Sequence, residues 1–139
     1  MSSSSAIPWN DLREQARQAT ATSYAPYSHV TVGACAITTD GRVVVGANVE
    51  NASYGLTLCA ECSLVSDLAR QGGGRLLAVS IVAGDGEPIA PCGRCRQLLF
   101  EHVGNDLLVD AGEDHDPTPL RELLPGAFGP EDLGIRRSE

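Results

Sequence analysis

Four of the five cysteines in this chain form two pairs with the spacing of metal ligands. Cys59 and Cys62 make the first pair, Cys92 and Cys95 make the second, and Cys35 stands alone. Thiolates at this spacing bind zinc, and such pairs also form redox sites. The spacing therefore leaves three hypotheses: a closed structural zinc site with four thiolates, an open zinc site with three thiolates and a water, or a thioredoxin-like redox pair.

The residues around the two pairs favour the open zinc site. Glu61 lies between the first two cysteines, and Pro91 precedes Cys92. Zinc deaminases carry the pattern H-x-E followed by P-C-x-x-C, in which a cysteine can replace the histidine and the glutamate does not bind the metal. The chain matches this pattern at every defined position. A structural zinc site needs no carboxylate at that place, and a redox pair needs no second pair.

The pattern suits the removal of an amino group from cytosine, which requires hydroxide near neutral pH. Zinc lowers the pKa of a bound water to about 7, so that zinc-bound hydroxide can attack the ring carbon that carries the amino group. Glu61 could take the water's proton, give it to the ring nitrogen and later assist the departure of ammonia. Read alone, a glutamate in a helix would be a solvated surface group.

Hydrophobic periodicity predicts the elements that must position these residues. Trp9, Leu12, Ala16 and Ala19 recur at helical spacing after Pro8. The predicted elements are a helix from Pro8 that ends before Tyr24, strands over 32–39 and 42–49 joined by a turn at Gly41, a helix over 59–70, a strand over 76–83, a helix over 92–102, a strand over 107–110 and a helix over 120–124. This order indicates an α/β layered sandwich with a mixed sheet, and both cysteine pairs fall at helix N-termini. Those N-termini would offset part of the thiolate charge, since each carries about half a positive charge.

Length and composition narrow the class of protein. A chain of 139 residues indicates one domain, with residues 1–7 and 130–139 as flexible tails. We expect a cytoplasmic protein without a membrane partner, because the sequence has no secretory signal and no long apolar run. The formal net charge of −8 disfavours a nucleic-acid partner, whose phosphates are held by Lys and Arg.

Over residues 24–128 the chain resembles the small zinc-dependent cytidine deaminases of pyrimidine nucleoside salvage. The resemblance rests on residues 25–28, 32–34, 48–53, 59–61 and 91–97. It implies a three-layer α/β/α sandwich around a five-stranded mixed sheet, one zinc per chain, and a homotetramer with shared active sites. The activity it implies is the hydrolysis of cytidine and deoxycytidine to uridine and deoxyuridine plus ammonia.

The resemblance also assigns the residues of the site. It implies that Cys59, Cys92 and Cys95 bind zinc, that Glu61 is catalytic, and that Cys62 is not a ligand, although the closed site with four cysteines stays open as a hypothesis. Five further residues are implied to contact substrate: Asn48 and Glu50 at the ribose hydroxyls, Ala60 through its backbone N–H at the pyrimidine carbonyl, and Phe128 and Tyr54 in an adjacent subunit's site.

Two positions depart from the family pattern. Val30 stands where relatives often have Phe, so an apolar contact with the nucleoside remains but stacking is lost. Cys62 stands where many relatives have Arg beside the ligand thiolates. Charge compensation must then come from the helix N-termini, with Arg94 or Arg96 as further candidates.

Three rival functions follow from the same motifs. Deaminases of nucleoside antibiotics share the cysteine motifs but lack the full run at residues 48–53. Deaminases of deoxycytidylate or nucleic acids would need a basic pocket for phosphate. A zinc-stabilised binding module without catalysis would not need Glu61.

Overall fold

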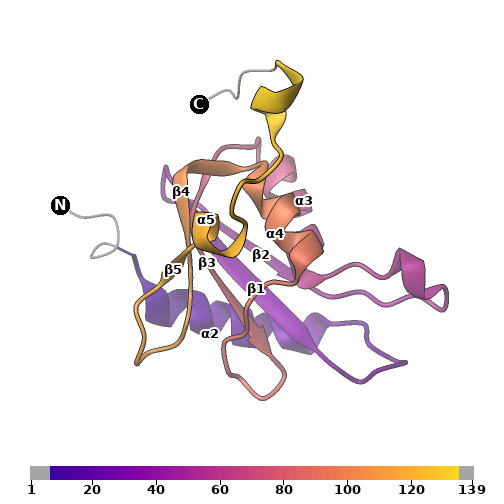
Figure 1. Ribbon diagram of the computed structural model, residues 1–139. Coiled ribbons are helices and arrows are strands. Elements are labelled where there is room, and N and C mark those ends of the chain that lie inside the picture. Colours follow the sequence, from indigo (N-terminus) through magenta and orange to yellow (C-terminus); the bar gives the residue numbers. More distant parts are fainter. Residues whose placement is uncertain (1–6, 135–139) are drawn as a thin grey trace.

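A five-stranded mixed sheet forms the centre of the computed structural model, which describes residues 7–134 apart from the side chains of residues 104 and 105 (Figure 1). The strands are β1 (Val32–Thr38), β2 (Val43–Ala47), β3 (Leu76–Ala83), β4 (Val103–Val109) and β5 (Thr118–Pro119), in the order β2-β1-β3-β4-β5. β3 and β4 run parallel, and the other neighbouring pairs are antiparallel. β1 and β2 make the predicted hairpin.

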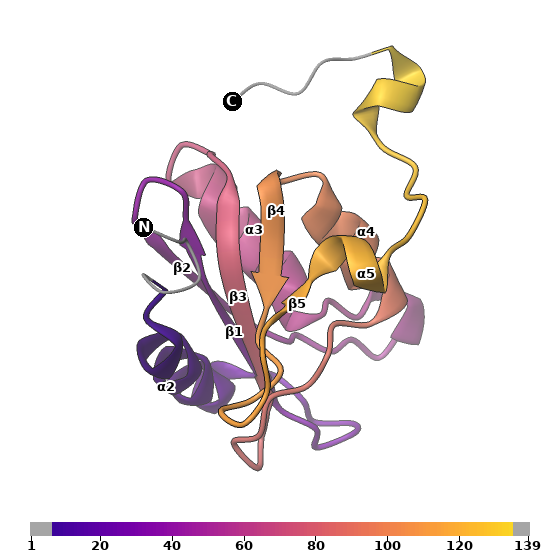
Figure 2. The ribbon, with the colours of Figure 1, turned by 60° about the vertical axis from the view of Figure 1, so that its left-hand side comes forward.

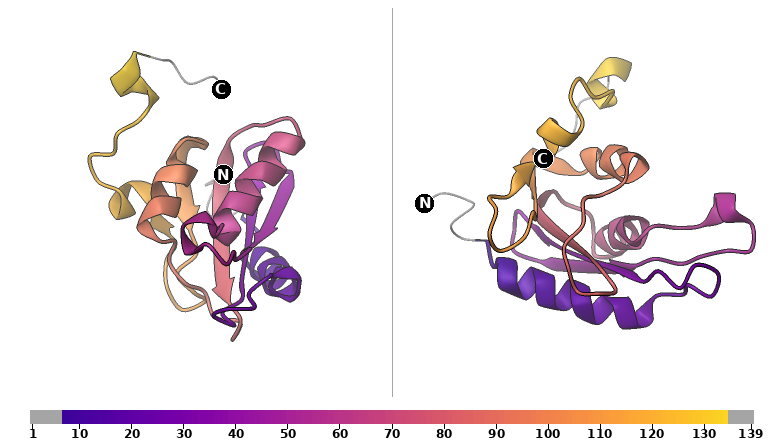
Figure 3. Two further views of the ribbon diagram at one scale, coloured as in Figure 1. Left: turned by 90° about the vertical axis from the view of Figure 1, so that its right-hand side faces the viewer. Right: turned by 60° about the horizontal axis from the view of Figure 1, so that its bottom comes forward.

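Helices cover both faces of this sheet. α2 (Trp9–Ala19) lies on one face, and α3 (Ala60–Arg70), α4 (Gly93–Phe100) and α5 (Leu120–Leu123) lie on the other (Figures 2 and 3). Along β1, Ala34 and Ala36 belong to the core beneath α3, whereas Cys35 belongs to the core beneath α2. This alternation follows from the strand's geometry, since successive side chains point to opposite faces. The predicted three-layer sandwich is confirmed.

Several element boundaries differ from the prediction. α3 and α4 each begin one residue later than expected, because Cys59 and Cys92 are their N-caps with extended backbone. β4 begins at Val103 rather than Leu107, because parallel pairing of Val103 with Leu76 extends it through a polar stretch. Short 3₁₀ helices that were not predicted occur at η1 (Thr20–Thr22), η2 (Tyr54–Leu56) and η3 (Pro130–Leu133).

The expected flexible tails fall largely outside the described residues, which exclude 1–6 and 135–139. Within the described part, Ile7 is buried against α2, and η3 occupies the start of the C-terminal tail. In residues 7–134, no helix is long and apolar enough to span a bilayer.

The first turn of α3 packs directly on β2 at Gly46. A methyl group on Gly46 would lie 2.3 Å from the carbonyl oxygen of Ala60 and 2.4 Å from the backbone nitrogen of Leu64. Because both contacts are backbone atoms, neither could move without shifting the helix. The absence of a side chain at this position therefore sets how closely the N-terminus of α3 approaches the sheet.

We expect Gly46→Ala to lower the free energy of unfolding by about 1–3 kcal/mol, as overpacking does in close-packed cores. Urea unfolding of the purified variant measures this change. Gly55→Ala is the matched control, because a methyl group there would meet no atom within 4 Å. Equal stability of the two variants would contradict this account of the contact between helix and strand.

Candidate active site

The sulfur atoms of Cys59, Cys92 and Cys95 lie within 4.8 Å of one another. Cys59 is the N-cap of α3, Cys92 is the N-cap of α4, and Cys95 lies in the first turn of α4. Three sulfurs bound tetrahedrally to one zinc, each at about 2.3 Å, would lie about 3.8 Å apart. The cluster therefore fits one zinc ion, and these three residues are the chain's three-cysteine zinc site.

The surroundings of the three thiols call for a cation. Burial raises the pKa of the Cys59 thiol, and burial together with the charge of Glu61 raises the pKa of the Cys95 thiol. Burial acts in the same direction on Cys92, but hydrogen bonds from Cys95 outweigh it and lower the pKa of that thiol. Deprotonation of Cys59 and Cys95 therefore needs nearby positive charge, which bound zinc would supply and which two helix N-termini reinforce.

Glu61 lies beside the sulfur cluster on the first turn of α3. Its side chain lines a cavity of about 220 Å³ together with Cys59, Cys92 and Asn48. Glu61 is only 4% exposed, and this burial raises the pKa of its carboxyl group. The structure thus brings the predicted catalytic carboxylate and two zinc ligands to one partly apolar cavity.

Cys62 lies outside the sulfur cluster that the described residues form. Its sulfur instead accepts a hydrogen bond from Arg94 at 3.5 Å, and the same guanidinium donates to the carbonyl of Thr57 at 3.3 Å. Arg96 donates to the carbonyls of Pro91 and Leu123. These two arginines therefore connect α4 to neighbouring backbone segments.

Asn48 lines the cavity that holds Glu61, and its side-chain amide makes two hydrogen bonds to the backbone. Its Oδ1 accepts from the backbone N–H of Val32 at 2.9 Å, and its Nδ2 donates to the carbonyl of Val30 at 2.8 Å. An amide has four hydrogen-bonding positions, so one N–H and one lone pair of Asn48 remain after these bonds. The residue closes the loop before β1 and has one N–H and one lone pair left at the cavity.

Glu50 lines a neighbouring cavity of about 420 Å³ rather than the cavity that holds Glu61. Thr57 lines both cavities, so the two are adjacent. The carboxylate of Glu50 accepts hydrogen bonds from the Ser28 hydroxyl and from the backbone N–H groups of Ser28 and Tyr27. These bonds, the Ser28 hydroxyl foremost, lower the pKa of Glu50.

The remaining predicted substrate residues occupy different surroundings. Ala60 is fully buried at the start of α3 and lines the cavity with Glu61. Tyr54 lines the cavity with Glu50 yet is 78% exposed, on η2, which projects from the body of the molecule (Figure 1). Val30 and Phe128 are 56% and 58% exposed. Within one chain, the structure does not bring Val30 or Phe128 into either cavity.

Sequence reasoning missed several residues that line the cavity with Glu61. Thr57, Leu58, Ile81, Ile89 and Ala90 contribute its walls. None of these residue types signals chemistry, and they come from three separate segments of the chain. Only the short spacing from Thr57 and Leu58 to Cys59 could have indicated their place.

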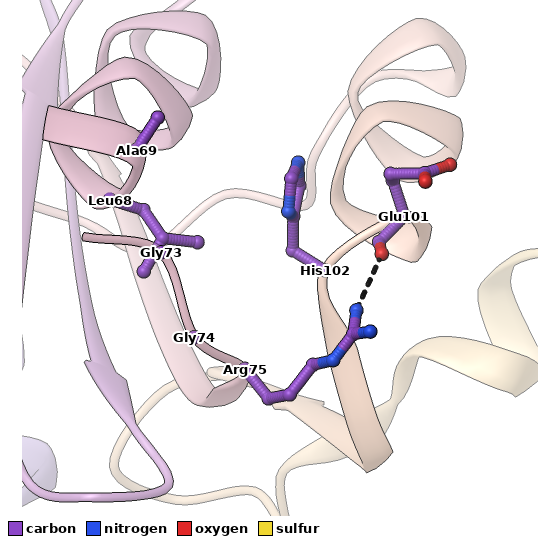
Figure 4. A pocket seen from close by; sticks show the side chains of 7 residues that line it. All are labelled: Leu68, Ala69, Gly73, Gly74, Arg75, Glu101 and His102. Carbon is purple, nitrogen blue, oxygen red and sulfur yellow. Dashed lines mark hydrogen bonds between the residues drawn. The ribbon is translucent and has the colours of Figure 1, made fainter. Parts of the chain in front are cut away.

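A further cavity of about 280 Å³ lies at the opposite ends of α3 and α4 (Figure 4). It is lined by Leu68, His102, Arg75 and Glu101 among others, and the Arg75 side chain donates to the Glu101 carbonyl at 2.9 Å. None of the predicted site residues lines this cavity. The zinc ligands and Glu61 therefore lie at the N-terminal ends of α3 and α4, away from this cavity.

Comparison with known proteins agrees with this geometry. Residues 9–109 match the family model described as the cytidine and deoxycytidylate deaminase zinc-binding region. The chain is 57% identical over 131 residues to the cytidine deaminase of Mycobacterium tuberculosis, covering 94% of this chain and 97% of the relative. It is 42% identical over 125 residues to the cytidine deaminase of Halalkalibacterium halodurans, covering 88% and 95%.

Solved structures give the same result. The crystal structure of the M. tuberculosis cytidine deaminase superposes with a TM-score of 0.84 at 57% identity, covering 88% of this chain and 98% of that one. The cytidine deaminase from Burkholderia pseudomallei superposes with a TM-score of 0.78 at 40% identity, covering 88% and 100%. With the family model matched over the zinc ligands and Glu61, the chain belongs to the family of zinc-dependent cytidine and deoxycytidylate deaminases.

Proposed function

We propose that the protein is a hydrolytic deaminase of cytidine and deoxycytidine. One water replaces the ring amino group, so that each nucleoside gives uridine or deoxyuridine plus ammonia. The observation that carries the proposal is the placement of Glu61 in one cavity with the zinc ligands Cys59 and Cys92. Relatives of similar length that are named cytidine deaminases support the same substrate class.

Glu61 is the proton carrier in this reaction. Zinc, when bound by the three thiolates, supplies a Lewis acid that makes water acidic near neutral pH. The Glu61 carboxylate accepts a proton from the attacking water and donates it to the ring nitrogen beside the amino-bearing carbon. It then carries the proton of the newly added hydroxyl to the amino group, which leaves as ammonia while the ring carbonyl forms. The burial of Glu61 limits competition from bulk water for these protons.

Backbone and side-chain groups near Glu61 orient the nucleoside. The N–H of Ala60 belongs to the first turn of α3, whose N–H groups have no partner within the helix, and we assign it to the pyrimidine carbonyl. The remaining N–H and lone pair of Asn48 suit one ribose hydroxyl. The carboxylate of Glu50, held in place by Ser28, suits another hydroxyl and disfavours a 5′-phosphate. Val30 contributes an apolar contact in this assignment.

We further propose a homotetramer in which neighbouring chains complete each site. Tyr54 lies on η2, and Phe128 lies in the segment that leads away from the body to η3; both segments project from the molecule (Figures 1 and 3). Both aromatic side chains are largely exposed, although aromatic rings stabilise a protein most when they are buried. A closed symmetric assembly would bury them against an adjacent chain's nucleoside.

We place the reaction in the cytoplasm, in the salvage of free pyrimidine nucleosides. The three ligand cysteines bind zinc only as reduced thiolates. A reducing compartment preserves these thiolates, whereas an oxidising compartment favours disulfides.

We expect Glu61→Gln to retain zinc and fold while losing turnover by a factor on the order of 10² or more, because the amide keeps the shape but cannot carry a proton. Ammonia release from cytidine measures turnover, and metal analysis measures zinc. Near-normal turnover in a fully zinc-loaded variant would exclude Glu61 as the proton carrier.

We expect Cys62→Ser to keep one zinc per chain, because Cys62 lies outside the sulfur cluster. Cys92→Ser is the matched comparison and should lose most of its zinc. Metal analysis after exhaustive dialysis distinguishes them. A folded Cys62→Ser protein without zinc would establish a site with four cysteine ligands instead.

We expect Phe128→Ala to weaken nucleoside binding by about 1–3 kcal/mol, the scale of one lost base–aromatic stack. In mixed tetramers of Glu61→Gln and Phe128→Ala chains, some sites would combine an intact Glu61 with a neighbour's intact Phe128. Activity should then exceed the sum of the two parents. If mass spectrometry shows subunit exchange but activity stays additive, Phe128 does not act across an interface.

A further inference from the structure

One row of polar side chains on α3 follows the outer edge of β2. Ser63, Asp67 and Gln71 are spaced four residues apart, so they lie on one side of the helix. The Ser63 hydroxyl donates to the Ala47 carbonyl at 2.8 Å, the Val45 N–H donates to the Asp67 carboxylate at 3.0 Å, and the Gln71 amide donates to the Val43 carbonyl at 3.1 Å. We call these three side chains the polar row.

The polar row matches the repeat of the strand that it contacts. Four residues of helix rise about 6 Å, and two residues of strand rise about 6.8 Å. The spacing of residues 63, 67 and 71 along the helix therefore matches the spacing of residues 47, 45 and 43 along the strand, which runs in the opposite direction. Because β2 is the outermost strand on its side of the sheet, the backbone groups of these residues that face away from β1 have no strand partner within residues 7–134.

Contacts at both ends complete the attachment of α3. The N-terminal turn rests on Gly46, where a side chain cannot be accommodated. At the C-terminal end, the Arg42 guanidinium donates to the carbonyls of Gln71 at 3.3 Å and Gly73 at 2.6 Å. Arg42 belongs to the turn before β2, so the same strand and its turn hold α3 along its whole length.

α4 is attached by a separate set of contacts. Arg96 on α4 donates to the carbonyls of Pro91, just before the helix, and Leu123, at the end of α5. Apart from the direct bond from Arg94 on α4 to the Cys62 sulfur on α3, the two helices that carry the zinc ligands are thus anchored to different parts of the fold. The position of Cys59 and Glu61 relative to Cys92 and Cys95 depends on both anchors.

We propose that the polar row is a positioning device that fixes Cys59 and Glu61 on α3 at the zinc site without help from the metal. Ser63, Asp67 and Gln71 lie outside the sulfur cluster and line neither of the two adjacent cavities, so they act through the depth and rotation of α3. The expected effect of the polar row on zinc affinity is argued from the geometry of α3 and the sulfur cluster. Only its effect on turnover rests on the proposed function. A preformed site loses less ordering entropy when zinc binds, so its affinity is higher.

The test measures zinc affinity of the full-length enzyme by competition with a chromogenic chelator. We expect Asp67→Ala to raise the zinc dissociation constant about tenfold, and the triple variant with Ala at 63, 67 and 71 to raise it further, on the scale seen for groups that orient metal ligands. Asp67→Asn keeps an oxygen that can accept from the Val45 N–H, so it should restore most of the affinity.

Two controls separate this role from general stability. Arg70→Ala removes the exposed ion pair with Asp67 but leaves β2 untouched, and its zinc affinity should equal that of the unsubstituted enzyme. Leu12→Ala destabilises the opposite face, because it removes a fully buried side chain from the core beneath α2, and it should lose stability without losing zinc affinity.

Unchanged zinc affinity in Asp67→Ala and the triple variant would overturn the proposal, as would an equal loss in Leu12→Ala. Hydrogen exchange of α3 amides after zinc removal gives an independent measure: we expect protection in the unsubstituted chain and its loss in the triple variant. Failure of the proposed function would look different, because the unsubstituted, zinc-loaded enzyme would then release no ammonia from cytidine.

Discussion

The structure depends on bringing three negatively charged sulfurs to one point at the edge of a largely apolar cavity. Two helices meet this requirement because both begin at this point, and their N-termini carry partial positive charge. Cys59 and Cys92 are themselves the N-caps. Each helix must then be held at a fixed depth. Gly46 lets α3 approach the sheet, and Arg96 ties α4 to α5. The sheet thus serves chiefly as the support on which the two helix ends converge.

Polar groups around the cavity are oriented before any ligand arrives. Asn48 closes the loop between Val30 and Val32, and Glu50 is held by Ser28 and its neighbours. Side chains fixed in this way lose little conformational entropy on binding, which is the main advantage of preorganisation. The same bonds leave each group only a few free hydrogen-bonding positions, and in the proposed function the sugar would be recognised through these.

Much of the fold and the metal site could be predicted from the sequence, because strong local patterns carry them. The cysteine spacing with Glu61 and Pro91 favoured an open zinc site, the resemblance supplied its three ligands, and hydrophobic periodicity located the main helices and strands. Periodicity missed the start of β4, where tertiary pairing with Leu76 overrides a polar sequence, and β5 is too short to show a pattern. Spacing alone fits Cys62 as a ligand as well as Cys59; the resemblance implied that Cys62 is not one, and its place outside the sulfur cluster agrees. Wall residues such as Ile89 have no chemical signature.

The coverage of β2 has a consequence for how copies of this chain can associate. An open strand edge invites another strand to pair with it, and repeated pairing builds fibrils. Here the polar row occupies backbone groups along the outer side of β2, and the strand at the other end of the sheet, β5, has two residues, one of them Pro119, which lacks an N–H. Neither border offers a template for sheet extension. Growth by strand pairing is therefore disfavoured, which leaves helices and projecting loops as the surfaces through which copies could meet.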